Sequence, residues 1–267
     1  MEDWIAHPAV QAAVIPFIVA LIVAVPLART RWLALAQAAG FVACATVAVG
    51  WSIEPFTTTR KLAFAGAASV LLAIAIEKAG AHRRAVGALS VVAAAVAAVW
   101  MLSRVLAQKD LVAGLPIAAV AATWVAWQVA AVLQISRDPV RGAAAGAVLG
   151  WATGMVGILG ASALLGTLAL AAGSAAAATA LVQFVRNEPA GIGRSSSLPS
   201  VAVAALAVPA VVLTGDLSWY DALPLTAVVP LAGLTPFFLT PRLRCITAFS
   251  FGAVPAAIAV SLAWYRS

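Results

Sequence analysis

Charged residues are scarce in this sequence. Aspartate, glutamate, lysine and arginine make up only 9% of the 267 residues, whereas 64% are hydrophobic and the mean hydropathy is +1.06. A soluble domain carries roughly 25% charged and 45–50% apolar residues. One core cannot hide this much apolar surface from water, so the composition excludes an ordinary soluble domain. It predicts a polytopic membrane protein with the lipid bilayer as its solvent.

Side chains that bind metals or act as nucleophile–base pairs are equally few. The two histidines, His7 and His82, and the two cysteines, Cys44 and Cys245, lie far apart in the sequence. This excludes the paired histidines of a haem-binding bundle and any disulfide framework. It also excludes a rhomboid-type protease built on the "GAS" at 160–162, because no histidine follows position 82. With no phosphate loop or metalloprotease motif either, we expect no enzyme activity, no metal and no cofactor.

The excess of basic residues is dispersed along the chain. The net charge is +7, yet the lysines and arginines fall in short loops, and no basic run is interleaved with aromatic residues. We therefore expect no nucleic-acid partner. Basic loop residues instead report the orientation of the chain in a bilayer.

Apolar segments long enough to cross a bilayer follow one another along the whole chain. A membrane helix needs about 20 apolar residues. Region 142–185 contains 44 residues without a charge. As one helix it would be about 66 Å long, twice the ~30 Å hydrocarbon core, so we expect a hairpin that turns near 157–162. The expected spans are 8–28, 33–51, 62–77, 85–103, 111–135, the two arms of 142–185, 198–214, 222–240 and 245–264.

The positions of lysine and arginine orient these ten spans. If both termini lie outside, the inner loops hold Arg29, Arg31, Lys78, Arg83, Arg84, Arg137, Arg141, Arg186, Arg194, Arg242 and Arg244. The outer segments then hold Arg60, Lys61, Arg104, Lys109 and Arg266. This is the asymmetry of the positive-inside rule. We expect an all-α bundle of about ten transmembrane helices with very short loops and both termini outside, in a bacterial cytoplasmic (inner) membrane.

A single integral membrane domain covering 1–267 is expected, because no linker sets a soluble domain apart. The longest polar piece, 186–200, divides seven spans from three. A division near 137–141 would instead give two halves of five spans in inverted orientation, as in many transporters. The second alternative rests on the helix count alone.

Glycines recur every four residues in "GAAAGAVLGWATGMVGILG" (142–160). Four residues advance about 400° around a helix, so these glycines form a ridge along one side. We interpret this glycine ridge as a helix-packing surface on which another backbone lies closely. The alternative is a thin wall against which a substrate, lipid tail or partner helix lies. The ridge consists of Gly142, Gly146, Gly150, Gly154, Gly157 and Gly160.

Two tryptophans and a glutamine lie together in the middle of span 111–135, within "ATWVAWQVA". Aromatic belts lie at headgroup depth, so these residues need another role. One role is core packing, with the polar groups bonded across helices. The other is the wall of a cavity for a neutral ligand, completed by polar residues of the 142–185 hairpin. The candidate substrate-binding residues are Trp124, Trp127, Gln128, Trp151, Thr153 and Gln183.

The expected ninth span, "ALPLTAVVPLAGLTPFFLT", is interrupted by prolines. An interior proline removes one hydrogen bond from a helix. Pro230 and Pro236 would free the carbonyls of Thr226 and Ala232, and Gly233 lies between them. The prolines predict either packing kinks or a hinge beside a cavity formed by the last three spans.

These features favour a transporter or permease for a neutral, amphipathic or lipid-like small molecule. Ten compact spans without a soluble domain are a frequent carrier format, and buried charge for an ionic substrate is lacking. The alternative is a non-catalytic membrane scaffold or accessory subunit of a larger complex, because small-residue surfaces and tiny loops suit a protein that packs. The expected partners are the lipid bilayer and other membrane subunits or further copies of the chain.

Overall fold

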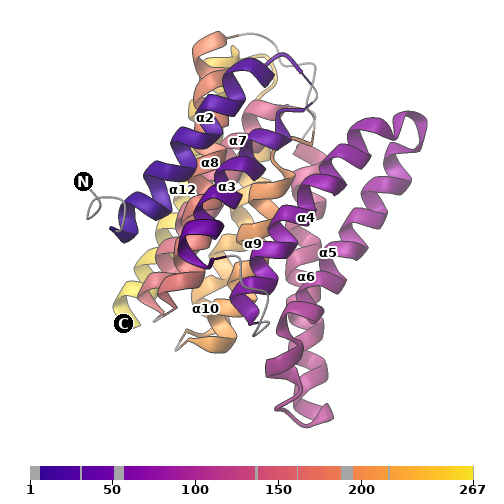
Figure 1. Ribbon diagram of the computed structural model, residues 1–267, viewed down its shortest axis with the longest axis vertical. Coiled ribbons are helices and arrows are strands. Elements are labelled where there is room, and N and C mark those ends of the chain that lie inside the picture. Colours follow the sequence, from indigo (N-terminus) through magenta and orange to yellow (C-terminus); the bar gives the residue numbers. More distant parts are fainter. Residues whose placement is uncertain are drawn as a thin grey trace.

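The chain folds into a bundle of helices (Figure 1). The computed structural model describes residues 7–30, 32–50, 57–135, 138–160, 162–187, 195–215 and 217–266, and these ranges contain helices, turns and bends but no strand. The elements are η1 (Val10–Val14), α2 (Ile15–Leu27), α3 (Ala34–Ala48), α4 (Thr58–Lys78), η2 (Gly80–His82), α5 (Arg83–Leu106), α6 (Leu111–Ile135), α7 (Pro139–Leu159), α8 (Ala163–Arg186), α9 (Leu198–Thr214), α10 (Trp219–Ala222), η3 (Leu223–Ala227), α11 (Val228–Gly233) and α12 (Pro241–Arg266).

Seven helices in the described part of the chain are long and apolar enough to cross a membrane. They are η1 with α2, then α4, η2 with α5, α6, α7, α8 and α12. Two shorter helices, α3 and α9, are also apolar. The prediction of an all-helical, multi-pass membrane protein is therefore confirmed.

The long uncharged region forms two helices, as expected. α7 ends at Leu159 and α8 begins at Ala163, so the turn lies at the predicted place, near 157–162. The two arms pack on each other along their length. Asp138 caps the start of α7, and its carboxylate accepts a hydrogen bond from the Val140 N–H at 3.1 Å.

The expected span 222–240 is wrong as a single helix. Helical structure there consists of α10, the 3₁₀ segment η3 and α11, and it ends at Gly233. Pro230 lies in the first turn of α11, where a missing N–H costs no helical bond. Because Pro230 offers no donor to the Thr226 carbonyl, the preceding turn tightens into a 3₁₀ segment. Pro236 lies in the non-helical stretch beyond the helix rather than inside it.

The centre of the bundle is formed by α7, α8 and α9. In the most apolar 18-residue stretch, 78% of the residues of α7 and 72% of those of α8 are buried, against 22–39% in the other long helices. Nearly all of α9 is buried as well. The other helices surround these three, with α2 and α3 against α8, α4 and α6 against α9, and α12 against α7.

The α5–α6 hairpin lies at the periphery and reaches beyond the rest of the bundle at one end (Figure 1). Apolar residues are strongly exposed at the start of α6, where Leu111, Val112 and Leu115 show 80%, 85% and 67% of their surface. An apolar surface of this kind requires lipid or a protein partner around it.

Candidate functional site

Two cavities lie end to end between α4 and α5. The large cavity has a volume of about 770 Å³ and lies between the end of α4, the start of α5 and the end of α6. The apolar cavity has a volume of about 440 Å³ and lies farther along α4 and α5, with α9 as its third wall. We call the two together the furrow.

The furrow turns around α5. The large cavity is lined there by Ala88 and Val91 and the apolar cavity by Ala94 and Ala97. Residues three positions apart on a helix lie about 60° apart around its axis, so Val91 and Ala94 are neighbours, whereas Ala88 and Ala97 lie on opposite sides. The two cavities therefore adjoin at Val91 and Ala94, and the apolar cavity continues around α5 to Trp100.

On α4, the lining residues of the two cavities share one face. Ile76 lines the large cavity, and Leu72, Ser69 and Ala65 line the apolar cavity. Of these four, only Ser69 carries a polar side chain, and its hydroxyl donates to the Gly66 carbonyl at 2.6 Å. The polar group is thus satisfied within its own helix, and the apolar cavity presents hydrocarbon to any occupant.

The mouth of the large cavity is basic. Arg83, Arg84 and Gln134 belong to its wall. Arg83 forms an ion pair with the buried Glu77 carboxylate at 3.3 Å. The other oxygen of Glu77 accepts hydrogen bonds from the backbone N–H and the hydroxyl of Ser195, both at 2.8 Å. The Nε of Arg83 is buried and has no hydrogen-bond partner among the described residues.

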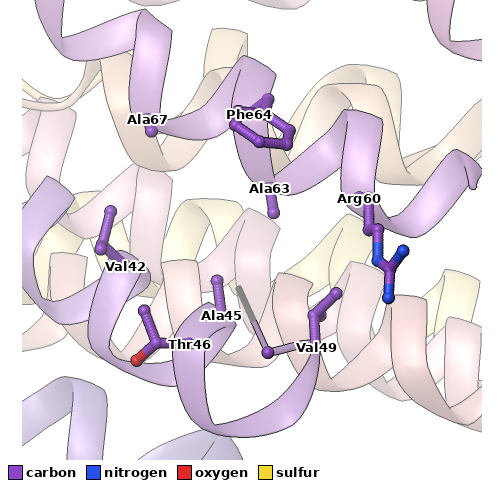
Figure 2. Close-up of a pocket in the computed structure, with 9 residues that line it drawn as sticks. Val42, Ala45, Thr46, Val49, Arg60, Ala63, Phe64 and Ala67 are labelled. Carbon is purple, nitrogen blue, oxygen red and sulfur yellow. The ribbon is translucent and has the colours of Figure 1, made fainter. Parts of the chain in front are cut away.

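A third, much smaller cavity of about 100 Å³ lies on the other side of α4, against α3. Figure 2 shows Ala63 and Arg60 of α4 pointing towards Ala45 of α3 and Val49, the residue after it. Phe64 borders this cavity and the apolar cavity alike. The volume of this third cavity falls short of the roughly 300–1,000 Å³ of typical ligand sites, so we take the furrow as the candidate site.

Two of the predicted ligand-binding residues bond to the backbone of the η3 segment. The Gln128 amide donates to the Leu225 carbonyl at 2.8 Å, and the Trp127 indole donates to the Thr226 carbonyl at 3.1 Å. Thr226 is the residue whose carbonyl Pro230 leaves free. Trp127 therefore supplies a donor to the carbonyl that Pro230 leaves free, as irregular backbone in a membrane requires. Gln128 adds a second bond to the Leu225 carbonyl, which also accepts from the Val228 N–H.

The second freed carbonyl is satisfied locally. Thr235 donates its hydroxyl to the Ala232 carbonyl at 2.9 Å. Gly233 is also held, because its carbonyl accepts from an Arg141 guanidinium nitrogen at 3.4 Å. The segment with Pro230, Gly233 and Pro236 is thus irregular but tied to its neighbours at several points.

A cluster of buried charges fixes the start of α7. The Asp138 carboxylate pairs with Arg244 of α12 at 2.6 Å and with Arg141 at 3.4 Å. The Arg141 guanidinium also lies over the Phe237 ring, 3.6 Å from its centroid. Arg141 is 1% exposed, so a full charge is buried here against a single shared carboxylate. No spacing in the sequence signals this cluster, because Arg244 and Phe237 come from a distant part of the chain.

The remaining predicted residues have different partners. The Trp124 ring lies 6.3 Å from the Trp219 ring, and the Trp151 indole donates to the Ser174 hydroxyl at 3.2 Å. Thr153 and Gln183 are buried, and the Thr153 hydroxyl and the Gln183 side-chain oxygen have no partner among the described residues. None of the six predicted residues lines any of the three cavities described above.

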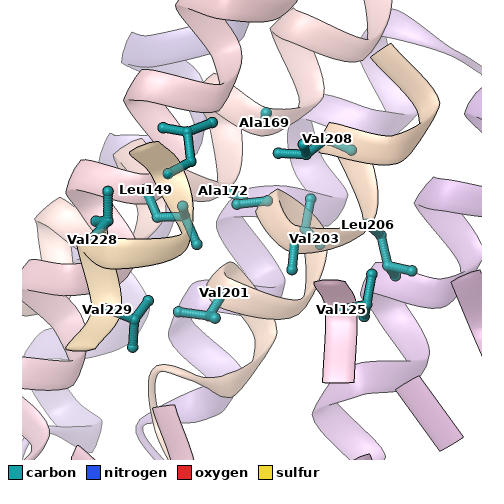
Figure 3. Packing of buried hydrophobic residues seen from close by; sticks show 14 of the residues in the cluster. Val125, Leu149, Ala169, Ala172, Val201, Val203, Leu206, Val208, Val228 and Val229 are labelled. Carbon is teal, nitrogen blue, oxygen red and sulfur yellow. The ribbon is translucent and has the colours of Figure 1, made fainter. Parts of the chain in front are cut away.

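The glycine ridge packs against α8 and its neighbours. A Cβ at Gly150 would lie 2.5 Å from the Gly173 backbone, and a Cβ at Gly157 would lie 2.9 Å from the Cα of Gly166. Gly142 faces Ser197 at the start of α9. Figure 3 shows the apolar side chains that fill the centre around these close contacts. The ridge therefore brings helix backbones together, and no cavity described above borders it.

A buried polar link that the sequence did not predict joins α3 to the centre. The Gln37 amide donates to the Thr179 hydroxyl at 2.9 Å, and the Ser200 hydroxyl donates to the Gln37 side-chain oxygen at 2.6 Å. Gln37 is fully buried and both of its polar atoms are used. This link is a structural tie between α3, α8 and α9.

The fold is that of a multi-pass helical membrane protein, and the furrow lies between its helices α4, α5, α6 and α9. Within the described ranges, no group of three or more histidine, cysteine, aspartate or glutamate side chains is placed to hold a metal ion. No protein-family model, curated protein or solved structure matches the chain.

Proposed function

We propose that this chain is a membrane permease that moves an amphipathic or lipid-like small molecule along the furrow. The observation that carries the proposal is that the two cavities follow one face of α4, from Ile76 to Ala65, and adjoin at Val91 and Ala94 of α5. From Arg84 to Trp100, α5 rises about 24 Å at 1.5 Å per residue. This length is most of the ~30 Å hydrocarbon core of a bilayer.

A path for an amphiphile needs apolar walls and few fixed charges at depth. Alanines of both helices and of α9 form much of the apolar cavity, which leaves width for an occupant. The cationic side chains of the furrow lie at one end, in Arg83 and Arg84. The arrangement suits a molecule with one polar end and one apolar end.

The proposed topology has ten crossings with both termini outside, in a bacterial cytoplasmic membrane. Support comes from counting α3, α9 and the α10–η3–α11 segment as crossings in addition to the seven long helices. In this topology Arg83, Arg141 and Arg244 lie on the inner side, as the positive-inside rule favours. Cysteine labelling of single-cysteine variants in intact cells measures the topology directly.

Transport is tested by filling the furrow. Ala97→Phe places a ring in the apolar cavity, whereas Val96→Phe places the same ring on the neighbouring, 61% exposed position of α5. In proteoliposomes loaded with fluorescent short-chain phospholipid, we expect Ala97→Phe to slow chemically detected transfer between leaflets at least tenfold. Val96→Phe should transport at the wild-type rate. Equal rates in wild type, both variants and protein-free vesicles would refute the proposed function.

The alternative function is a non-catalytic subunit of a larger membrane complex. The projecting α5–α6 hairpin favours it, because the apolar residues at the start of α6 are not covered by the rest of the chain (Figure 1). Purification from the native host in mild detergent distinguishes the two. A stoichiometric second protein that accompanies the wild type and is lost in the Val112→Glu variant would support the subunit. Recovery of the chain alone would count against it.

A further inference from the structure

The two ends of the furrow differ in chemistry. The apolar cavity offers hydrocarbon, since the only hydroxyl of its wall, that of Ser69, is bonded within α4. The large cavity has Arg83, Arg84 and Gln134 in its wall. An occupant that satisfies both ends is an anionic amphiphile.

The basic end has hydrogen-bonding capacity to spare. Glu77 neutralises Arg83, so Arg84 supplies the net positive charge of the wall. The Arg83 Nε is buried without a hydrogen-bond partner among the described residues. A buried donor left unpaired is unfavourable, and an anionic oxygen within reach of it satisfies it. Glu77 therefore holds Arg83 at the cavity wall with one of its donors unused.

We infer that the furrow binds an anionic membrane phospholipid, with its phosphate at Arg83 and Arg84 and an acyl chain in the apolar cavity. This inference rests on the proposed function and names its substrate class. The volume of about 770 Å³ lies within the roughly 300–1,000 Å³ of ligand sites. A free phosphate would use only the basic end, whereas a phospholipid also uses the apolar cavity that continues from it.

Binding is tested by quenching of tryptophan fluorescence with brominated lipid. Trp100 lines the apolar cavity, so a brominated acyl chain bound in the furrow lies near its indole. Brominated phosphatidylglycerol and brominated phosphatidylcholine are titrated separately into the purified full-length chain in mixed micelles. We expect stronger quenching by phosphatidylglycerol, and we expect Trp100→Phe to remove the difference between the two lipids. Equal quenching by the two lipids in the wild type would overturn the inference.

Arg84→Gln and Arg104→Gln form the matched pair of variants, because Arg84 lies in the first turn of α5 and Arg104 lies in its last turn. One basic side chain at an anionic membrane surface contributes about fivefold in affinity. We expect Arg84→Gln to weaken phosphatidylglycerol binding about fivefold, Arg84→Lys to restore most of it, and Arg104→Gln to bind like wild type. Equal losses in Arg84→Gln and Arg104→Gln would assign the attraction to the general surface and overturn the inference. Displacement of brominated phosphatidylglycerol by inorganic phosphate at millimolar concentration would overturn it too.

The binding experiment and the transport experiment test the two proposals separately. Selective binding with no leaflet transfer would leave the phospholipid site standing and remove the permease. Equal transfer of fluorescent phosphatidylglycerol and phosphatidylcholine, unaffected by Arg84→Gln, would leave the permease standing and remove the anionic substrate.

Discussion

The hairpins α5–α6 and α7–α8 are similar in length and hydropathy but occupy opposite places in the bundle. Their helices have 24 and 25 residues in one case and 21 and 24 in the other. Their most apolar stretches have mean hydropathies of 2.3 and 1.7 against 1.5 and 1.8, yet only the second hairpin is mainly buried. Hydropathy therefore does not decide which hairpin becomes the core.

The spacing of small residues decides which hairpin is buried in the centre of the bundle. In a bilayer, lipid tails solvate apolar side chains as well as a neighbouring helix does, so close backbone packing selects the partners. α7 and α8 bring glycine against glycine, as at Gly150 and Gly173. α5 has Gly87, where a Cβ would have Leu133 at 3.8 Å as its nearest neighbour. The first arrangement closes the helices together, and the second leaves the furrow open.

The largest difference in the effect of a substitution on stability is expected between two aspartates, one at the start of α6 and one at the start of α7. Asp138 accepts from the Val140 N–H and is buried between two arginines, whereas Asp110 accepts from the Ala113 N–H and is exposed. Asparagine caps a helix as well as aspartate does. Asp138→Asn should lower the free energy of unfolding by about 3–5 kcal/mol, because it leaves buried cations without their carboxylate.

Asp110→Asn is the control for this pair and should change the free energy of unfolding by less than about 0.5 kcal/mol. Unfolding in mixed micelles with increasing sodium dodecyl sulfate measures both variants. A loss of similar size in the two proteins would show that the charge cluster at Asp138 contributes no more than an ordinary helix cap.

The next contrast is between two glycines. Gly150→Ala forces a Cβ to within 2.5 Å of the Gly173 backbone and should destabilise the protein by about 1–3 kcal/mol. Gly87→Ala meets only ordinary contact and should stabilise it by roughly 0.5–1 kcal/mol, since alanine is the better helix former. Thermal unfolding in detergent gives the sign of each change. Stabilisation by Gly150→Ala would mean that α7 and α8 are not closely packed.

The smallest contrast concerns two glutamines of α6. Gln128→Leu leaves the Leu225 carbonyl without its side-chain donor and should cost about 1–2 kcal/mol of stability. Gln134→Leu, at the mouth of the large cavity, should leave stability within about 0.5 kcal/mol. Transport per folded molecule should be unchanged in Gln128→Leu. A selective loss of transport there would place Gln128 in the substrate path after all.

The sequence predicted the helices well where their ends carry charges or turn residues. Spans 111–135 and 198–214 match α6 and α9 residue for residue, and the turn of the 142–185 hairpin lies where length required it. The span 222–240 failed because two prolines six residues apart change the hydrogen-bond pattern of the backbone around them. Hydropathy alone does not register that change.

The furrow could not be predicted from sequence. α5 is apolar on every side, so no periodicity marks the face that lines a cavity. The cluster at Asp138 and the link at Gln37 join residues that are far apart in the sequence, and no local sequence pattern predicts such contacts. The sequence singled out Trp127 and Gln128 as polar groups in the middle of an apolar span. In the structure, they donate hydrogen bonds to the carbonyls of Thr226 and Leu225.

The link at Gln37 has a consequence for the order in which the protein is made. Gln37 and Thr179 are separated by 142 residues. At about 5–20 residues per second of synthesis, α8 is made roughly 7–30 s after α3. During that time the Gln37 amide has neither Thr179 nor Ser200 to bond. The first helices to leave the ribosome must therefore wait in lipid or beside the insertion machinery, and α3 docks only when the centre of the bundle arrives.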